Sequence, residues 1–415
     1  MPSVLSEPVK LPCGLVLPNR LAKAALAESL AGSKNAVTPT LLKAYDRWGQ
    51  GGWGMILTGN VQVDVNHLGQ PFDPALQGEY TGDATDLVAS WAAYATAVQQ
   101  HGTPGIVQLC HPGRQSVRFA GRRGMFAATL APSAIPLQMG DGLVARWLSW
   151  FLFPPPRAMD QADIDRVTRQ FVDAARLMAD SGFSGVELHG AHGYLIDQFL
   201  NAKTNKRTDA YGGSAEKRAK FVLDIIRAIR EVVPRGFAVG IKLNSADHSS
   251  STFEETMTQI QLLVEAGVDF LEISGGSYEN PEMMGIDAHK SERTLAREAF
   301  FIEFASETRQ RFPNLVLMLT GGFRTRAGAE SAVQQNVCDI VGLGRPAAID
   351  PNLPKVFLDE GLEEEKARLV LGRVPVPALA RLLPFKGVGA GLESNYYAAQ
   401  IKRFAQGLRT IIPGV

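Results

Sequence analysis

The stretch DQADIDRVTRQFVDAARLMADSGFSGVELHGAHGYLIDQFL, residues 160–200, joins a helical pattern to a short apolar run. It begins with DQAD, which resembles a capping box. It continues with apolar side chains at helical spacing, at Ile164, Val167, Phe171, Ala174 and Met178. The following GVELH, residues 185–189, is as short and apolar as a buried strand of a parallel sheet. The stretch therefore predicts one helix–strand unit of an α/β fold.

Similar units recur along the chain. The runs that we interpret as strands are residues 20–27, 53–61, 105–111, 185–189, 237–244, 269–274, 315–322 and 338–344. Further helix candidates lie between them and start near Thr38, Asp83, Ser214, Thr252 and Thr325. Short strands that alternate with helices indicate a parallel sheet. Eight such units in 415 residues favour a single closed (β/α)8 TIM barrel over an open doubly wound sheet.

Three segments add to the predicted barrel. VKLPCGLVLPN reads as a hairpin within residues 8–18 that plugs the barrel, and residues 111–159 form a long loop of the kind that covers active sites. NYYAAQIKRFAQGL places an apolar stripe on one predicted helix, at Tyr397, Ile401, Phe404 and Leu408. We therefore expect a barrel domain over residues 1–360 and a helical extension over 361–415, packed on the barrel or on a partner subunit.

Composition limits the classes of function. Lysine plus arginine equals aspartate plus glutamate, at 42 each, so no basic field invites nucleic acid. The three cysteines, Cys13, Cys110 and Cys338, are too few and too scattered for a disulfide framework. No signal-peptide pattern is present, and the most apolar window, residues 143–153, is far shorter than the roughly 20 residues of a membrane-spanning helix. We expect a cytoplasmic protein with neither a nucleic-acid nor a membrane partner.

In a barrel of this kind, function belongs at the C-terminal ends of the strands. The predicted strand ends carry small residues and neutral hydrogen-bonding side chains. These are Ala25–Ala27, Thr58–Asn60, Gln108, His111, His189, His192, Tyr194, Lys242, Asn244, 274–276, 321–322 and 342–345.

The last two strand ends favour a phosphate site. LTGGFRT and GLGRPA place Gly322 and Gly344 just before predicted helices, where backbone N–H groups can point at an anion. Arg345 would add a charge-assisted contact. Glycines that merely turn the chain are the alternative.

Lys242 lies on its predicted strand, GIKLN, with no carboxylate beside it. A buried ammonium without a partner is costly, so we expect it to contact an electron-rich group. A Schiff-base lysine, a lysine that supports an anionic heterocycle and a structural lysine all remain open. A metal at His189 and His192 would need further ligands, and Asp247 is the nearest acidic candidate, so no metal is predicted. His189 and His192 could instead have a purely structural role.

Four motifs, spread over residues 10 to about 355, resemble one known family. They are LPNRLAKAALAE, VQLCHPGRQS, HGAHGYLIDQFLNAKTNKRTDAYGGSAEKRAKF and IVGLGRPAAIDP. The chain resembles the old yellow enzyme family of FMN-dependent ene-reductases, especially its fungal NADH:flavin oxidoreductase-like members. The resemblance implies a single barrel that binds FMN and accepts hydride from NADPH or NADH. It also implies reduction of the activated C=C bond of an enone or enal.

The resemblance also implies roles for individual residues. The implied FMN-binding positions are Ala24, Ala25, Leu26, Ala27 and Gly59 at the ring, Gln108 and Lys242 at its pyrimidine edge, and Gly322, Gly344 and Arg345 at the phosphate. His189 and His192 would bind the substrate carbonyl oxygen, and Tyr194 would donate the proton. Ser29 would contact substrate where some bacterial members carry tyrosine. Ala27 departs from the threonine or cysteine of relatives, and Lys242 from their frequent arginine.

Other readings remain at this level. The same site suits a redox-neutral flavin-dependent isomerase of a secondary-metabolite pathway. Lys242 could instead serve a Schiff-base lyase, and the barrel could be a non-catalytic binding partner. The sequence leaves open the physiological substrate, the choice between NADH and NADPH, homodimer formation and the effect of Ala27 on the flavin potential. It also leaves open the role of residues 143–153, which could shape the acceptor pocket or a subunit contact.

Overall fold

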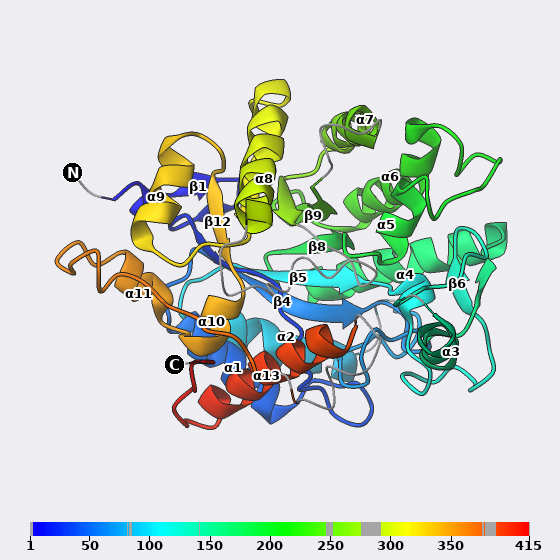
Figure 1. The fold of residues 1–415 in the computed structure, drawn as a ribbon, viewed down its shortest axis with the longest axis horizontal. Coiled ribbons are helices and arrows are strands. Elements are labelled where there is room, and N and C mark those ends of the chain that lie inside the picture. The colour runs from blue at the N-terminus through cyan, green and yellow to red at the C-terminus, as the bar shows by residue number, and fades with distance from the viewer. Residues whose placement is uncertain are drawn as a thin grey trace.

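The predicted α/β barrel is confirmed by a computed structural model, which describes residues 3–80, 82, 85–140, 142–245, 252–274, 292–375, 377 and 387–414, with the backbone alone for 292–301 and 387–390. A closed parallel barrel has the strand order β10-β11-β12-β3-β4-β5-β8-β9 (Figure 1). Its strands are β3 (Leu21–Lys23), β4 (Met55–Gln62), β5 (Gly105–Cys110), β8 (Gly185–Gly190), β9 (Ala238–Asn244), β10 (Phe270–Ser274), β11 (Leu317–Thr320) and β12 (Ile340–Leu343).

Each predicted strand region contains one barrel strand, but β3 and β11 end two or more residues earlier than predicted. β3 ends at Lys23 rather than at residue 27, and β11 ends at Thr320 rather than at residue 322. Ala24 follows β3 and makes the last backbone hydrogen bond to β12, where its N–H donates to Leu343 O at 3.1 Å. Beyond it the chain turns away from both neighbouring strands, so residues 25–27 form a loop at the mouth of the barrel.

The N-terminal hairpin closes the opposite end of the barrel, as predicted. β1 (Val9–Lys10) pairs antiparallel with β2 (Val16–Leu17), and Leu11 and Leu17 pack in one cluster with inward residues of the barrel strands. Cys13 N–H donates to Asp269 at 2.8 Å, which ties the turn to the start of β10. The plug therefore leaves the C-terminal strand ends as the open mouth.

Helices surround the strands. They are α1 (Pro39–Gly49), α2 (Thr85–Gln99), α4 (Gln161–Asp180), α5 (Leu195–Leu200), α6 (Ala215–Val232), α7 (Thr252–Glu265), α8 (Glu292–Arg311), α9 (Arg326–Gln334), α10 (Arg345–Ile349) and α11 (Leu353–Phe357), with short 3-10 turns at Val4–Ser6 and Gly113–Gln115. The predicted capping box is present at α4, where Asp160 accepts from Asp163 N–H and Asp163 accepts in return. Thr38, Ser214 and Thr325 cap α1, α6 and α9 through their hydroxyls.

The helical extension packs on the barrel. In α13 (Gly387–Ala405), Tyr397, Ile401 and Phe404 are buried, and the Phe404 ring lies 5.1 Å from the Trp48 ring of α1. The predicted stripe is wrong at Leu408, which is 50% exposed because the helix ends before it. The domain boundary at residue 360 stays a prediction.

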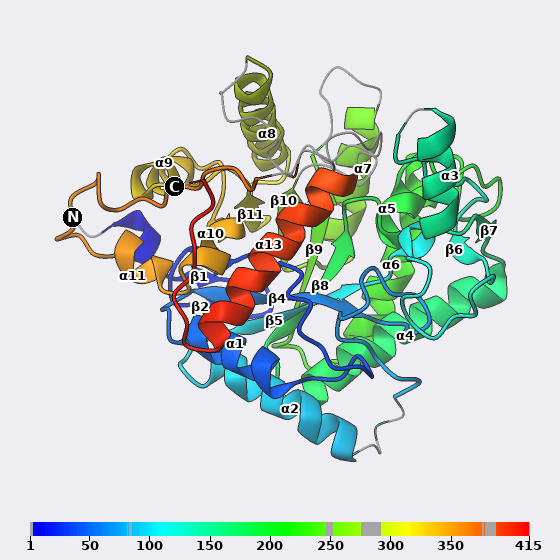
Figure 2. The same cartoon turned by 60° about the horizontal axis from the view of Figure 1, so that its bottom comes forward.

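The long loop has secondary structure of its own. It contains β6 (Thr129–Ala131), β7 (Pro156–Ala158) and α3 (Leu143–Leu152), and β6 pairs with β7 in a separate sheet. Figures 1 and 2 both place α3 on the side of the molecule toward which the β4 and β8 arrows point. Across the described part of the chain, no helix is both long enough and apolar enough to cross a membrane.

Candidate functional site

Two histidines and a tyrosine meet where β8 ends. His189 is the last but one residue of β8, and Tyr194 directly precedes α5. The His189 ring lies 5.1 Å from the His192 ring and 4.5 Å from the Tyr194 ring. The structure thus brings together the three side chains that the sequence places in catalytic roles.

The turn that holds these side chains is strained and braced. His192 has a φ of +59°, which is uncommon for a residue other than glycine. Its N–H donates to Asn244 Oδ1 at 3.1 Å, and Asn244 in turn donates to Asp197 at 2.9 Å. Asp197 also accepts from Gly193 N–H at 2.6 Å. These bonds from β9 and α5 offset the cost of the left-handed backbone.

Both imidazoles are neutral. Burial lowers the pKa of His189 and of His192 well below the usual value, and the Lys242 charge lowers both further. His189 Nδ1 accepts from Ala191 N–H at 3.3 Å, so Nε2 carries the hydrogen and is the donor. His192 Nε2 lies 3.0 Å from Ser274 Oγ at the end of β10, which is separated from β8 by β9 alone.

Tyr194 is almost fully buried at the centre of this group. Its hydroxyl accepts from Asn60 Nδ2 at 3.3 Å. A Cβ added to Gly69 would lie 2.8 Å from the same hydroxyl, so the loop after β4 packs closely over it. The position of the phenol is therefore set by β4 and its loop as well as by the β8 turn.

Lys242 has a carboxylate partner from outside its own strand. Its Nζ donates to Glu272 Oε1 at 2.7 Å, and both side chains are buried. Glu272 lies opposite Lys242 in the register of β9 with β10. The absence of a carboxylate from GIKLN therefore does not show that Lys242 is unpaired. Lys242 is thus held in an ion pair, whereas a Schiff-base lysine must have its amine available to attack a carbonyl carbon.

A second buried carboxyl completes this layer. Gln108 Nε2 donates to Glu187 Oε2 at 2.6 Å. Burial raises the pKa of Glu187 well above its usual value and the adjacent Glu272 raises it further, whereas Lys242 lowers the pKa of Glu272. The layer therefore holds a neutral Glu187 between the Gln108 amide and the Glu272–Lys242 pair.

The residues predicted at the flavin ring form a floor of small side chains at the mouth. Ala24 is buried, and Ala25, Leu26 and Ala27 are partly exposed. Gly59 leaves no room for a side chain, because an added Cβ would lie 2.2 Å from Leu26 O.

The backbone of Gly59 is engaged within the protein. Its N–H donates to Glu28 Oε1 and to Tyr45 Oη, both at 2.8 Å, and its carbonyl accepts from Thr58. These bonds fix the position of the Gly59 backbone, and its contact with a flavin ring stays a prediction. Burial and Glu28 together raise the pKa of Tyr45, so its phenol stays protonated.

The predicted phosphate positions lie together where β11 and β12 end. Gly322 has a φ of +74° and follows β11, and Gly344 precedes α10. An added Cβ on Gly344 would meet only Leu26, at 3.5 Å, so this glycine keeps space open next to the ring floor. Arg345 Nη1 donates to Glu393 of α13 at 2.7 Å, a partner that the sequence did not indicate.

These groups fit a bound FMN. A neutral amide and a cation lie in one interior layer, a floor of small residues adjoins them, and glycines with an arginine stand at one side. The amide and the cation suit the pyrimidine edge of FMN, the floor suits its ring, and the glycine turns with the arginine suit its phosphate.

Ser29 lies at the mouth but is bonded within the protein. Its hydroxyl donates to Gln70 Oε1 at 2.9 Å. Asp247, Gly275 and Gly276, which the sequence placed at strand ends, lie outside the described residues.

Sequence reasoning missed Glu187 and Glu272 as members of the site. Glu187 stands two residues before His189, and Glu272 two residues before Ser274, so each shares the inward face of its strand with a mouth residue. The two-residue periodicity could have identified both.

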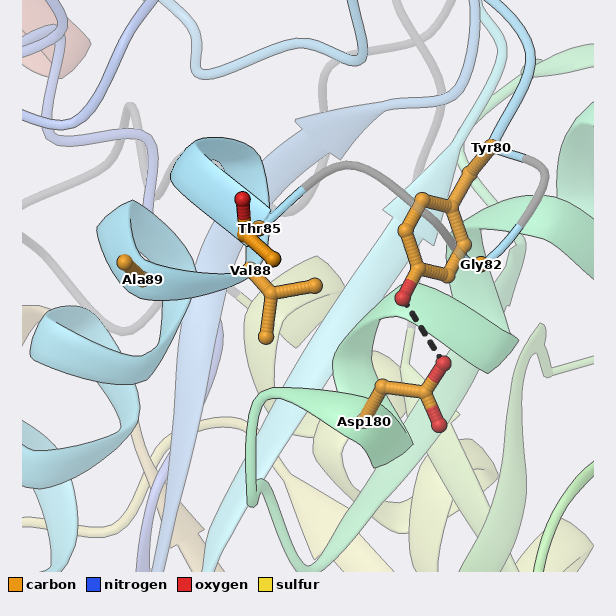
Figure 3. A pocket seen from close by; sticks show the side chains of 6 residues that line it. All are labelled: Tyr80, Gly82, Thr85, Val88, Ala89 and Asp180. Carbon is orange, nitrogen blue, oxygen red and sulfur yellow. Dashed lines mark hydrogen bonds between the residues drawn. The ribbon is translucent and has the colours of Figure 1, made fainter.

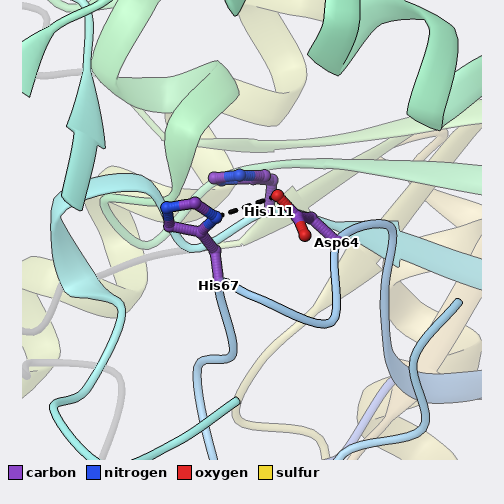
Figure 4. Close-up of side chains that lie close together, drawn as sticks. All are labelled: Asp64, His67 and His111. Carbon is purple, nitrogen blue, oxygen red and sulfur yellow. Dashed lines mark hydrogen bonds and ion pairs between the residues drawn. The ribbon is translucent and has the colours of Figure 1, made fainter. Parts of the chain in front are cut away.

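A separate cluster of possible ligands lies where the loop after β4 meets the start of the long loop. Asp64, His67 and His111 are buried, with ligand atoms within 4.8 Å of one another (Figure 4). Asp64 already accepts from His67 Nδ1 at 2.9 Å and pairs with Arg166 at 3.4 Å. His111 Nδ1 accepts from Gly113 N–H at 3.0 Å, which places its hydrogen on Nε2. These contacts describe a hydrogen-bonded support for the loop rather than a cation site.

A surface pocket lies away from the histidines. It lies on the outer surface between the start of α2 and the end of α4, where Tyr80 donates to Asp180 at 2.8 Å (Figure 3). It offers no residue of the barrel mouth and carries no candidate chemistry.

Comparisons with known proteins agree with the site. A model of the NADH:flavin oxidoreductase / NADH oxidase family matches residues 5–365. The NADH-dependent flavin oxidoreductase iccE of Talaromyces variabilis is 44% identical over 409 residues, which are 97% of this chain and 98% of that protein. The NADH-dependent flavin oxidoreductase iliE of Neonectria sp. is 42% identical over 96% of this chain but 54% of its own length. Among solved structures, morphinone reductase matches with a TM-score of 0.67 at 26% identity, over 86% of this chain and 90% of that one.

Proposed function

Because the chain belongs to the NADH:flavin oxidoreductase / NADH oxidase family, the old yellow enzyme family, we propose that it is an FMN-dependent ene-reductase that uses NADH. Its substrates would be α,β-unsaturated carbonyl compounds. The observation that carries the proposal is the meeting of two neutral imidazoles and a buried phenol above a layer that contains a lysine ammonium. The names of the curated relatives support NADH over NADPH.

FMN, when bound, supplies a hydride to the β-carbon of the substrate alkene. Gln108 and Lys242 would hold its pyrimidine edge, and Gly322, Gly344 and Arg345 its phosphate. Lys242 would favour negative charge at that edge, although Glu272 offsets part of its charge.

His189 and His192 would bind the carbonyl oxygen. Negative charge builds on this oxygen when the alkene is reduced, and N–H donors aimed at it stabilise the transition state by about 3 kcal/mol each. His189 Nε2–H is available for this role because Nδ1 is already an acceptor. His192 would share its Nε2 between Ser274 and the substrate.

Tyr194 would donate a proton to the α-carbon. Asn60 Nδ2 donates to the phenol oxygen at 3.3 Å and so helps to fix the position of the hydroxyl beside the two imidazoles. A redox-neutral isomerase would not need this net proton, and a Schiff-base lyase would need Lys242 without its carboxylate partner. The geometry therefore supports net reduction over both alternatives.

The test is Tyr194→Phe, assayed anaerobically in two half-reactions after reconstitution with FMN. Reduction of the bound flavin by NADH should stay near wild type, whereas reoxidation by an enone should slow by about 10²–10⁴-fold, the usual contribution of a general acid. Tyr211→Phe is the control, because Tyr211 is a buried tyrosine that bonds Asp224 on α6. Equal losses in both half-reactions of Tyr194→Phe would contradict the role of Tyr194 as proton donor. A failure of the wild-type protein to bind FMN would contradict the proposed function.

A further inference from the structure

The helix α3 exposes its large apolar side chains and buries its small ones. It buries its small residues Ala145 and Ser149, and the Ser149 hydroxyl accepts from Met139 N–H at 3.0 Å. Its large apolar side chains point outward instead: Leu143 is 84% exposed, Trp147 58% and Trp150 54%. A surface helix normally buries its apolar stripe against the core. The exposed side of α3 is therefore not explained by the folding of this chain.

Neighbouring aromatic rings extend this side into a continuous surface. Trp147 stacks on Phe151 at 5.6 Å, and Phe151 lies 6.1 Å from Phe119. Phe119 is 65% exposed and has a φ of +67°, a strained backbone for a bulky residue. We call this surface, made of Leu143, Val144, Trp147, Trp150, Phe151 and Phe119, the outer α3 face.

Arg118 holds the outer α3 face in place. Its N–H donates to Leu152 O and its guanidinium to Phe151 O, both at 2.7 Å, and the guanidinium lies 5.6 Å from the Trp150 ring. The rings are therefore displayed by a hydrogen-bonded frame rather than by a loose loop.

The surroundings of this face are basic in a chain with no net charge. Residues 111–159 contain six arginines and one acidic residue, Asp141, a balance of +5, whereas the whole chain has 42 basic and 42 acidic residues. Arg122, Arg146 and Arg157 are exposed in this segment, and of these Arg157 is paired with Asp163. Exposed tryptophan and phenylalanine beside arginine are typical of helices that lie in the interface of an anionic membrane.

We propose that the outer α3 face docks this protein on the surface of an anionic lipid bilayer, with α3 parallel to the membrane. This departs from the sequence expectation of no membrane partner, which considered only spanning segments. The docked segment begins at the barrel mouth, where Gln115 Nε2 donates to His192 O at 3.0 Å. A bilayer on this side would bring apolar molecules to the mouth of the barrel. The proposal does not depend on the proposed reaction.

The tryptophans provide a direct readout. Of the five in the chain, Trp48, Trp53 and Trp91 are buried, so Trp147 and Trp150 dominate any change at the surface. The full-length protein is mixed with phosphatidylcholine vesicles, with or without about one third phosphatidylserine. Vesicles that contain phosphatidylserine should co-sediment the protein and shift its fluorescence to the blue. Phosphatidylcholine alone should do neither.

Variants assign the effect to this face. Trp147→Ser with Trp150→Ser should abolish co-sedimentation, and Arg146→Glu should weaken it at least about fivefold, because each arginine near an anionic surface contributes about that factor. The control is Leu408→Ser with Ile411→Ser, which removes two equally exposed apolar residues from the C-terminal end. The control should bind like wild type.

Several outcomes would overturn the proposal. They are equal binding to both kinds of vesicle, unchanged binding of the tryptophan variant, or no binding by wild type. A concentration-dependent dimer that the tryptophan variant loses, without vesicle binding, would instead assign the face to a second copy of this chain. The rate of NADH oxidation with a water-soluble enone should be unchanged in the tryptophan variant, which would show that the variant is folded. This assay tests the proposed ene-reductase function separately from membrane docking.

Discussion

Asp73 is a buried carboxyl next to the barrel mouth whose ionisation opposes folding. It accepts from Gln62 Nε2 at 2.8 Å, and burial raises its pKa from 3.8 to about 7. The folded protein therefore holds a proton that the unfolded chain releases between these values. The stability from this group is fully present below pH 3.8 and is lost as the pH rises towards about 7.

Asp73→Asn should remove this part of the pH dependence. The free energy of unfolding of wild type, relative to the variant, should fall by up to about 1.4 kcal/mol per pH unit between pH 4 and about 7. Denaturant unfolding across this range measures the difference, with the exposed Asp165→Asn as the control. A constant difference between wild type and Asp73→Asn would show that Asp73 is ionised in the folded protein.

The candidate site was only partly predictable from single residues. His189, His192 and Tyr194 are close in sequence, so local spacing was enough to group them. Glu272 is 30 residues from Lys242 in sequence and meets it only through the pairing of β9 with β10. A local window shows a lone lysine because the neutralising carboxylate comes from another strand.

At the scale of elements, α13 packs on the barrel only through apolar residues that lie within the helix. Ile401 is fully buried and Phe404 packs edge-on against Trp48, whereas Leu408 lies past the end of the helix. Ile401→Ala should lower the free energy of unfolding by about 2–5 kcal/mol, because it leaves a cavity. Leu408→Ala should change it by less than about 0.5 kcal/mol.

Denaturant unfolding of both variants checks this contrast. Similar small effects would mean that α13 detaches before the barrel unfolds. Helical spacing alone was enough to predict the burial of Tyr397, Ile401 and Phe404. It failed at Leu408, since Gly407 takes a positive φ of 75° just after the helix ends.

At the scale of the whole molecule, the C-terminal extension reaches the predicted phosphate site. Glu393 of α13 accepts from Arg345 at 2.7 Å, although 48 residues separate them. A phosphate that binds Arg345 would meet the negative charge of Glu393. Glu393→Gln should therefore raise the affinity of the apoprotein for FMN about two- to fivefold.

Titration of apoprotein with FMN, followed by quenching of flavin fluorescence, measures this affinity. Glu231→Gln, an exposed change on α6, is the control. Weaker binding by Glu393→Gln would show that the carboxylate orients Arg345 instead of competing for it.

The sequence by itself determined the barrel, the plug and the cluster of His189, His192 and Tyr194. Strand and helix periodicity, helix caps and residues two to five positions apart are local properties, and they survive without knowledge of the fold. Only the tertiary structure decided the partner of Lys242, the contact from Glu393 to Arg345 and the outward direction of Trp147 and Trp150. Each of these depends on which strand or helix becomes a neighbour, and on which side of a helix meets the core, and chain spacing does not encode either.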